Sequence, residues 1–89
     1  MRCSVNIPLF LEHLANVTSA EVFGNSVGEC LDYFVKQFPP AKKLLFDESG
    51  RLLGHIDIYV NGVSTFPLEL ARPVKDGDAI SMLYLIVGG

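Results

Sequence analysis

The sequence has no run of basic residues. Its only adjacent basic pair is Lys42-Lys43, and ten acidic residues against seven basic ones give a formal net charge of −3. Proteins that bind nucleic acid generally carry a concentrated basic patch or stripe to neutralise phosphates. The charge balance therefore argues against a nucleic-acid-binding domain, and we expect no nucleic-acid partner.

Long hydrophobic segments are also missing, although 49% of the residues are hydrophobic. No stretch approaches the roughly 18 apolar residues that a membrane span needs. The first residues alternate polar and apolar, and Pro8 and Glu12 interrupt the next segment, so this region does not form the apolar part of a secretory signal. We expect a cytoplasmic protein with no membrane partner, built as a single domain over residues 1–89.

Cysteine and histidine are scarce, and their spacing fits no metal site. Cys3 and Cys30 are too far apart for a Cys-x-x-Cys pair and too few for an iron–sulfur cluster, which needs four ligands. His13 and His55 are isolated and lack metal-ligand spacing. We expect two buried thiols, with no metal and no bound cofactor.

The clearest periodic pattern is that of an amphipathic helix over residues 27–38. Ser26 and Glu29 fit a capping box, in which the serine hydroxyl accepts from an early helix N–H group and the glutamate reaches back. Pro39-Pro40 ends the helix. Apolar residues recur at intervals of three and one, which places them on one face: Val27, Cys30, Leu31, Phe34, Val35 and Phe38.

Alternation of polar and apolar residues predicts strands on both sides of this helix. Asn61-Gly62 predicts a tight hairpin, because a type I′ turn needs positive φ at both central residues. A short second helix is expected over residues 40–45. The expected strands are residues 2–7, 19–23, 55–60, 63–66 and 79–86.

This order of elements predicts an α+β fold of the β-grasp, or ubiquitin-like, type. One main helix packs across one face of a mixed sheet of four to five strands, with the first and last strands side by side at its centre. In the last strand, Ile80 and Met82 are expected to face the helix. Leu83 and Leu85 would then be exposed on the other face.

The sequence ends in Gly88-Gly89, directly after the last expected strand. A flexible tail without side chains is narrow and adopts backbone angles closed to other residues, so it can enter a tight channel in a partner. It presents one carboxylate, which ATP can convert to an acyl-adenylate at a partner's site. A sulfur nucleophile then displaces AMP and leaves a thiocarboxylate. The alternative is a frayed terminus without a function.

Several segments, weak alone, carry a family resemblance in combination: Val5-Asn6-Ile7-Pro8, the Ser26-capped helix ending at Phe38-Pro39, Phe46-Asp47-Glu48-Ser49-Gly50-Arg51-Leu52, Ile58-Tyr59-Val60-Asn61-Gly62, Val74-Lys75-Asp76-Gly77-Asp78 and Gly88-Gly89. In this order and spacing they resemble the MoaD/ThiS family of sulfur carriers over essentially the whole chain. The resemblance implies a protein co-substrate rather than an enzyme. It also implies an activating adenylyltransferase, related to ubiquitin-activating enzymes, that consumes ATP and leads to a thiocarboxylate on Gly89.

Two branches of the family stay open for this chain, and they differ in the enzyme that accepts the sulfur. The Val-Asn-Ile-Pro start and the Ile-Tyr-Val-Asn segment favour the carrier type of cysteine synthesis. The length also suits the small subunit of molybdopterin synthase and is long for a carrier of thiamine synthesis. Molybdopterin-type carriers usually have prolines before the tail, where this chain has Tyr84-Leu85-Ile86-Val87.

The expected partner-binding surface lies beside the tail and is apolar. It consists of outward-facing side chains and the residues that lead into the tail: Tyr59, Leu83, Leu85, Ile86 and Val87. Scattered apolar residues on an ordinary sheet, or a dimer face, are the alternatives for this surface. For the whole chain, the competing functions are a ubiquitin-like modifier joined to lysine through Gly89 and an interaction module with an inert tail.

Overall fold

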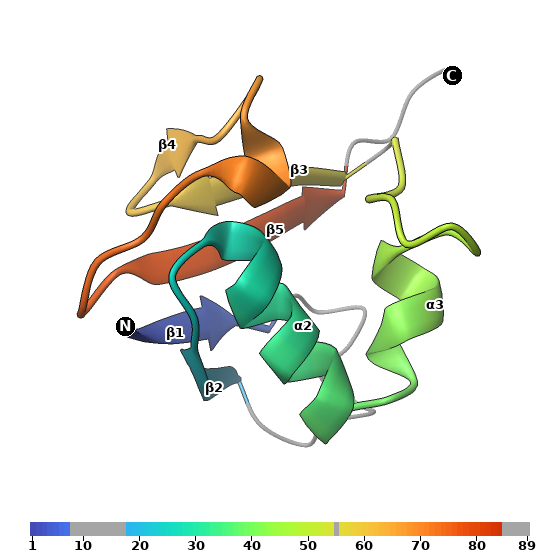
Figure 1. The fold of residues 1–89 in the computed structure, drawn as a ribbon, viewed down its shortest axis with the longest axis horizontal. Helices are drawn as coiled ribbons and strands as arrows, with labels where there is room; N and C mark the ends of the chain where they lie inside the picture. The colour runs from blue at the N-terminus through green and yellow to red at the C-terminus, as the bar shows by residue number, and fades with distance from the viewer. Residues whose placement is uncertain (8–17, 55, 85–89) are drawn as a thin grey trace.

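The computed structural model describes residues 1–7, 18–54 and 56–84. Within them, a mixed five-stranded sheet carries its helices on one face (Figure 1). The elements follow in the order β1 (Arg2–Asn6), β2 (Ser19–Phe23), α2 (Val27–Gln37), α3 (Ala41–Leu45), β3 (Ile56–Val60), β4 (Val63–Ser64), the 3₁₀ helix η1 (Glu69–Ala71) and β5 (Ala79–Tyr84). No helix in the described part of the chain is long and apolar enough to cross a membrane.

The strand order β2-β1-β5-β3-β4 places the last strand at the centre of the sheet. β5 pairs in parallel with β1, where Val5 lies opposite Ile80. It pairs antiparallel with β3, where Ile58 lies opposite Met82. The predicted α+β arrangement, with the first and last strands adjacent at the centre, is therefore confirmed.

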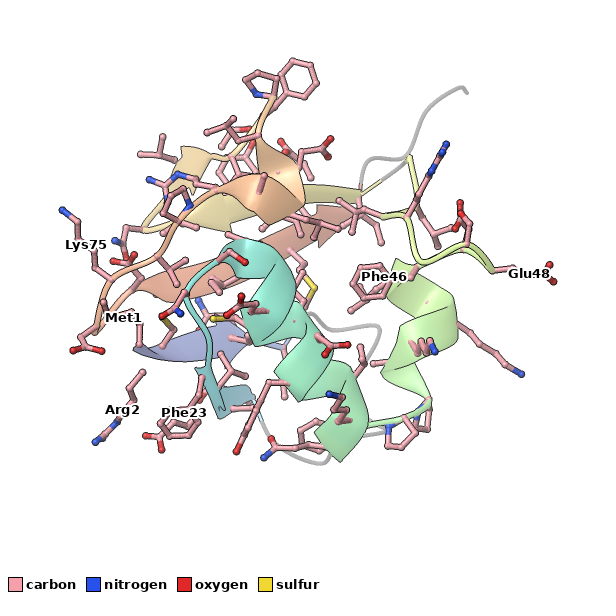
Figure 2. All side chains as sticks on the ribbon, viewed as in Figure 1. Met1, Arg2, Phe23, Phe46, Glu48 and Lys75 are labelled. Carbon is pink, nitrogen blue, oxygen red and sulfur yellow. The ribbon has the colours of Figure 1, made fainter. Side chains whose placement is uncertain are left out.

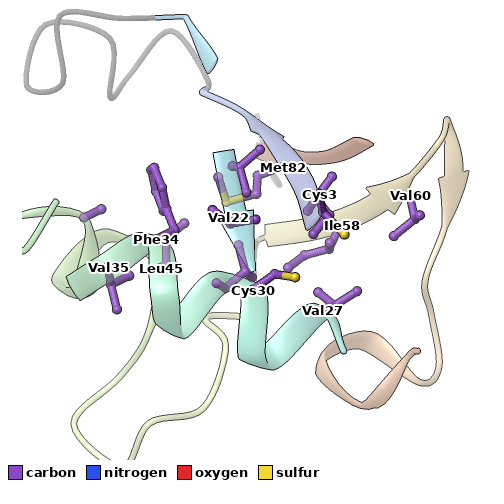
Figure 3. Packing of buried hydrophobic residues seen from close by; sticks show 14 of the residues in the cluster. Cys3, Val22, Val27, Cys30, Phe34, Val35, Leu45, Ile58, Val60 and Met82 are labelled. Carbon is purple, nitrogen blue, oxygen red and sulfur yellow. The ribbon is translucent and has the colours of Figure 1, made fainter. Parts of the chain in front are cut away.

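The apolar stripe of α2 covers one face of this sheet and closes the core (Figure 3). Buried side chains of the helix and the inward residues of β1, β2, β3 and β5 belong to one hydrophobic cluster, because alternate strand residues point to the same face. In β5, Ile80 and Met82 are buried as predicted, and Leu83 is exposed. The fully buried residues include Val5, Val22, Val27, Cys30, Leu31, Phe34, Ile58 and Ile80.

The predicted capping box starts α2. The Ser26 hydroxyl accepts a hydrogen bond from the Glu29 N–H group at 3.2 Å. The Glu29 carboxylate accepts from the N–H group of Asn25 at 2.9 Å, one residue before the capping serine. The helix ends at Gln37, with Phe38 as its cap, before the two prolines that were expected to stop it.

The Asn61-Gly62 turn has the positive φ values that a type I′ hairpin needs, 52° and 83°. The Asn61 amide also donates to Asp78 at 2.9 Å and accepts from the N–H group of Ala79 at 2.9 Å. These bonds join the hairpin turn to the start of β5, and so fix the register of the central strand.

Several boundaries differ from those expected. The main helix α2 ends at Gln37 rather than at residue 38, and α3 begins at Ala41 rather than at residue 40. β1 ends at Asn6. β4 contains only residues 63 and 64, and the chain continues through a cis Phe66–Pro67 peptide bond into η1, which was not predicted. β5 is described to Tyr84, so the predicted strand residues 85 and 86 lie outside the described residues, as do His13 and His55.

Candidate partner-docking site

The central strand β5 leads towards the C-terminal tail. Its last described residue, Tyr84, lies opposite Ile56 in β3, so β5 runs towards the Ile56 end of that strand. The predicted reactive residues, Gly88 and Gly89, lie outside the described residues, as do the predicted contact residues Leu85, Ile86 and Val87. Their roles stay predictions.

The two predicted contact residues that the structure describes lie on the same outer face of the sheet. Leu83 in β5 has 49% of its surface exposed, and Tyr59 in β3 is half-buried. Leu83 lies directly opposite Asp57, and Tyr59 is two residues further along the same strand. Side chains two residues apart on a strand share a face, so Leu83, Asp57 and Tyr59 form one surface.

Asp57 is the centre of a hydrogen-bond network on this face. Its carboxylate accepts from the Ser64 hydroxyl at 3.2 and 3.4 Å and from the Tyr59 hydroxyl. The hydrogen bond to the carboxylate and its negative charge raise the pKa of Tyr59 above its ordinary value of 10.0. The Tyr59 hydroxyl is therefore neutral at physiological pH and keeps its proton for donation to the Asp57 carboxylate.

Sequence reasoning missed Asp57 and Ser64. Period-two alternation places Asp57 on the face of Tyr59, but only the register with β4 brings Ser64 opposite Tyr59. That register depends on the Asn61-Gly62 turn, which the sequence does predict. The alternation in β3 and the hairpin register have to be combined to predict that the Asp57 carboxylate lies within reach of the Ser64 and Tyr59 hydroxyl groups.

The acidic residues of the turns have local structural roles. One carboxylate oxygen of Asp47 accepts from the N–H groups of Ser49 and Arg51 and from the Ser49 hydroxyl, at 2.7 to 3.0 Å. These bonds favour the charged form and lower the pKa of Asp47. No cluster of three or more possible metal ligands occurs among the described residues.

The two thiols are free and buried, as expected, and lie apart from the outer face. The Cys3 thiol donates to the backbone carbonyl of Lys75 at 3.4 Å. Burial, together with neighbouring Cys3, raises the pKa of Cys30 from 9.0 to about 12. A thiol with this pKa stays protonated at neutral pH and is therefore a poor nucleophile.

Comparison with known proteins shows that the chain is similar to small carrier and modifier proteins. No protein-family model matches it. The sulfur carrier protein CysO of Mycobacterium tuberculosis is 29% identical in an alignment of 93 positions, which covers 100% of both chains. A chain in the crystal structure of the Amycolatopsis orientalis BexX/CysO complex is 31% identical with a TM-score of 0.85, over 98% of this chain and 99% of that one. The small archaeal modifier protein 1 of Methanosarcina acetivorans is 26% identical with a TM-score of 0.84, over 99% and 96% of the two chains.

A central β5 between parallel β1 and antiparallel β3, with α2 across one face, defines a ubiquitin-like β-grasp protein. Within that class, similarity at 31% identity extends over nearly the whole chain. The chain belongs to the MoaD/ThiS-like family of sulfur carriers.

Proposed function

We propose that the chain carries sulfur as a thiocarboxylate on Gly89. The observation that supports this most is its end-to-end similarity to CysO carriers, in a fold whose central strand leads to Gly88-Gly89. The chain acts as a protein co-substrate, and the chemistry takes place in partner enzymes. We also propose that it works in the cytoplasm, where ATP is available, and holds no cofactor of its own.

The reaction begins with the Gly89 carboxylate. A carboxylate is a poor electrophile, so an adenylyltransferase joins it to the α-phosphate of ATP and releases pyrophosphate. A sulfide equivalent then attacks the carbonyl carbon of the acyl-adenylate. The new carbon–sulfur bond forms as the carbon–oxygen bond to AMP breaks, and AMP leaves with the electron pair. The resulting thiocarboxylate donates its sulfur to an acceptor in a synthase.

The outer face of the sheet supports docking to these partners. Leu83 is exposed at the end of β5 from which the chain continues to the tail, and Tyr59 lies on the same face. A relative, CysO of Amycolatopsis orientalis, forms a complex with BexX. We propose that this chain likewise assembles with a sulfur-accepting synthase, in a pathway that makes cysteine or a molybdenum or thiamine cofactor.

Removal of Gly88-Gly89 tests the proposed function. The shortened chain should keep its fold, measured by circular dichroism and thermal unfolding, because every described core residue is retained. It should lose all sulfur transfer in an extract of the native host supplied with MgATP. Unchanged activity of the shortened chain would instead support an interaction module with an inert tail.

A protein modifier is the second candidate function, favoured by the similarity to the Methanosarcina modifier protein. Both functions begin with adenylation of Gly89, and they differ in the nucleophile of the next step. Attack by a lysine amine forms an isopeptide bond and a conjugate of higher mass. Detection of conjugates linked through Gly89 in the native host would favour the modifier; a free chain with sulfur in place of one oxygen favours the carrier.

A further inference from the structure

An open pocket of about 610 Å³ lies at the short helix α3 and the turn that follows it. Two of its lining residues, Phe46 and Leu53, are apolar and half-buried, and we call them the apolar wall. Two others, Lys42 and Lys43 on α3, are exposed, and we call them the lysine pair. The volume is in the range of pockets that hold ligands, so there is room for a short segment of chain.

The pocket lies close to the point where the described part of β5 ends. Tyr84 is paired with Ile56 in β3. The N–H group of Ile56 donates to the Leu53 carbonyl at 3.2 Å, and the N–H group of Leu53 donates to the carbonyl of Leu45, the last residue of α3, at 2.9 Å. These hydrogen bonds join the end of the central strand, through Ile56, to the apolar wall.

Residues 85–89, the tail, are long enough to reach the lysine pair. Five extended residues span at most about 17 Å. From the apolar wall, the lysine pair is one helical turn away, about 5 Å, because the Phe46 N–H group donates to the Lys42 carbonyl at 2.9 Å. The tail can therefore run along the apolar wall and place its carboxylate at the lysine pair.

The chemistry of the tail matches that of the pocket in the same order. Leu85-Ile86-Val87 is apolar, and Gly89 carries the carboxylate of the proposed function. No ion pair occupies the lysine pair within the described residues, whereas Lys36 is paired with Asp32 at 3.1 Å. An exposed ion pair contributes little by itself, so the apolar contact has to supply part of the binding energy.

Two acidic residues of the pocket restrict where the carboxylate can lie. Asp47 and Glu48 are in the turn that follows α3, and both are exposed. The Asp47 carboxylate already accepts hydrogen bonds from Ser49 and Arg51, which favour its charged form. Both acids repel a second carboxylate, so the helix side of the pocket, where the lysine pair lies, is the favourable side for the chain end.

We propose that the tail docks in this pocket while no partner enzyme is bound. Residues 85–87 pack against the apolar wall, and the Gly89 carboxylate binds the lysine pair. The inference rests on the proposed function, which gives Gly89 its free carboxylate. A thiocarboxylate is also an anion, so the loaded tail docks in the same way. The reactive end is then held against the folded body until a partner draws it out.

Carbodiimide cross-linking of the purified 89-residue chain tests the docking. The reagent activates the Gly89 carboxylate as an O-acylisourea; a neighbouring lysine amine attacks the carbonyl carbon, the urea leaves, and an amide forms with net loss of one water molecule. In dilute monomer, peptide mapping by mass spectrometry should find Gly89 joined to the lysine pair. It should not find Gly89 joined to Lys75, which is also exposed but lies on the opposite side of the molecule from Phe46 and Glu48 (Figure 2).

A change confined to the tail separates docking from simple reach. The triple variant Leu85→Ser, Ile86→Ser, Val87→Ser keeps the length, the carboxylate and the whole folded body, but loses the apolar contact. Its yield of Gly89 cross-links should fall by about fivefold or more, because an undocked end has a lower effective concentration at the lysine pair. The cross-link within the Asp32–Lys36 ion pair should be the same in both chains and normalises the yields.

Nuclear magnetic resonance gives a second readout without a reagent. The backbone amide signals of Phe46 and Leu53 should differ between the wild-type chain and the triple variant, and that of Lys75 should not. Equal cross-link yields in the two chains, or Gly89 cross-links found only between molecules, would overturn the inference. The proposed function would then stand, because neither measurement uses ATP or a partner. Its own failure would appear separately, as a Gly89 that MgATP and host extract never modify.

Discussion

Gly24 shows how a single residue constrains the link between sheet and helix. A Cβ atom at this position would lie 2.7 Å from the Glu29 Cβ atom and 2.8 Å from the Cys30 backbone nitrogen. Both atoms belong to the first turns of α2 and cannot move without displacing the helix. We predict that Gly24→Ala lowers the free energy of unfolding by about 1 to 3 kcal/mol, measured by urea denaturation.

Gly54 is the control for this substitution. A Cβ atom there would have no described heavy atom within 4 Å, and its φ is not in the left-handed region. Gly54→Ala should leave stability within about 0.5 kcal/mol of the wild type, or raise it slightly by restricting the unfolded chain. Equal losses at both positions would contradict the close approach at Gly24.

Cys30 makes stability depend on pH in the alkaline range. Its pKa rises from 9.0 in the unfolded chain to about 12 in the folded one, chiefly because of burial. The folded state therefore favours the neutral thiol. This contribution to stability is complete below the unfolded pKa of 9.0 and is lost as the pH rises towards 12.

Urea denaturation at a series of alkaline pH values measures this effect. The wild-type chain should lose stability more steeply above pH 9 than Cys30→Val, a variant of similar volume without the ionisable group. Tyrosines and lysines titrate in the same range in both proteins, so only the difference between the two slopes reports on Cys30. Identical slopes would show that the thiol does not ionise differently in the two states.

At the scale of elements, α2 was the most predictable feature. Its apolar spacing, the Ser26–Glu29 box and the proline stop all agree, and the observed helix Val27–Gln37 differs by one residue from the expected range. The Asn61-Gly62 turn was equally clear, since its dihedral requirement is local. Such signals are readable because the interactions that create them span only a few residues.

The shorter β4 and η1 were not predictable in this way. In this region Thr65 is buried, and its hydroxyl and N–H group bind the Ile58 carbonyl across the hairpin, a contact that no local sequence pattern indicates. The helix-side burial of Ile80 and Met82 was predictable from alternation. The Asp57 network was missed because it needs the alternation in β3 and the register of β4 at the same time.

The capping box allows a direct test at this scale. Ser26→Ala removes the acceptor for the Glu29 N–H group, and should lower the free energy of unfolding by about 1 kcal/mol. Ser26→Asp keeps an acceptor at the helix start and should retain most of the stability. Urea denaturation of the three proteins checks this; equal losses in both variants would assign the effect to something other than the cap.

At the scale of the whole molecule, the sheet topology joins the C-terminal tail to the most firmly paired part of a small domain. The strand that precedes the tail is the central one, paired on both sides. Its outer face combines exposed Leu83 with the Asp57 network, while its inner face is part of the core. The order of elements in the sequence predicted the central position of the last strand, and the structure of the relative at 31% identity has the same overall fold, with a TM-score of 0.85.

The most direct test of the account is the intact mass of the chain isolated from its native host, with fragmentation to locate any change. We predict a population in which sulfur replaces one oxygen atom, with the change confined to Gly89. A chain whose Gly89 carboxylate stays unmodified while its host is actively assimilating sulfur would contradict it.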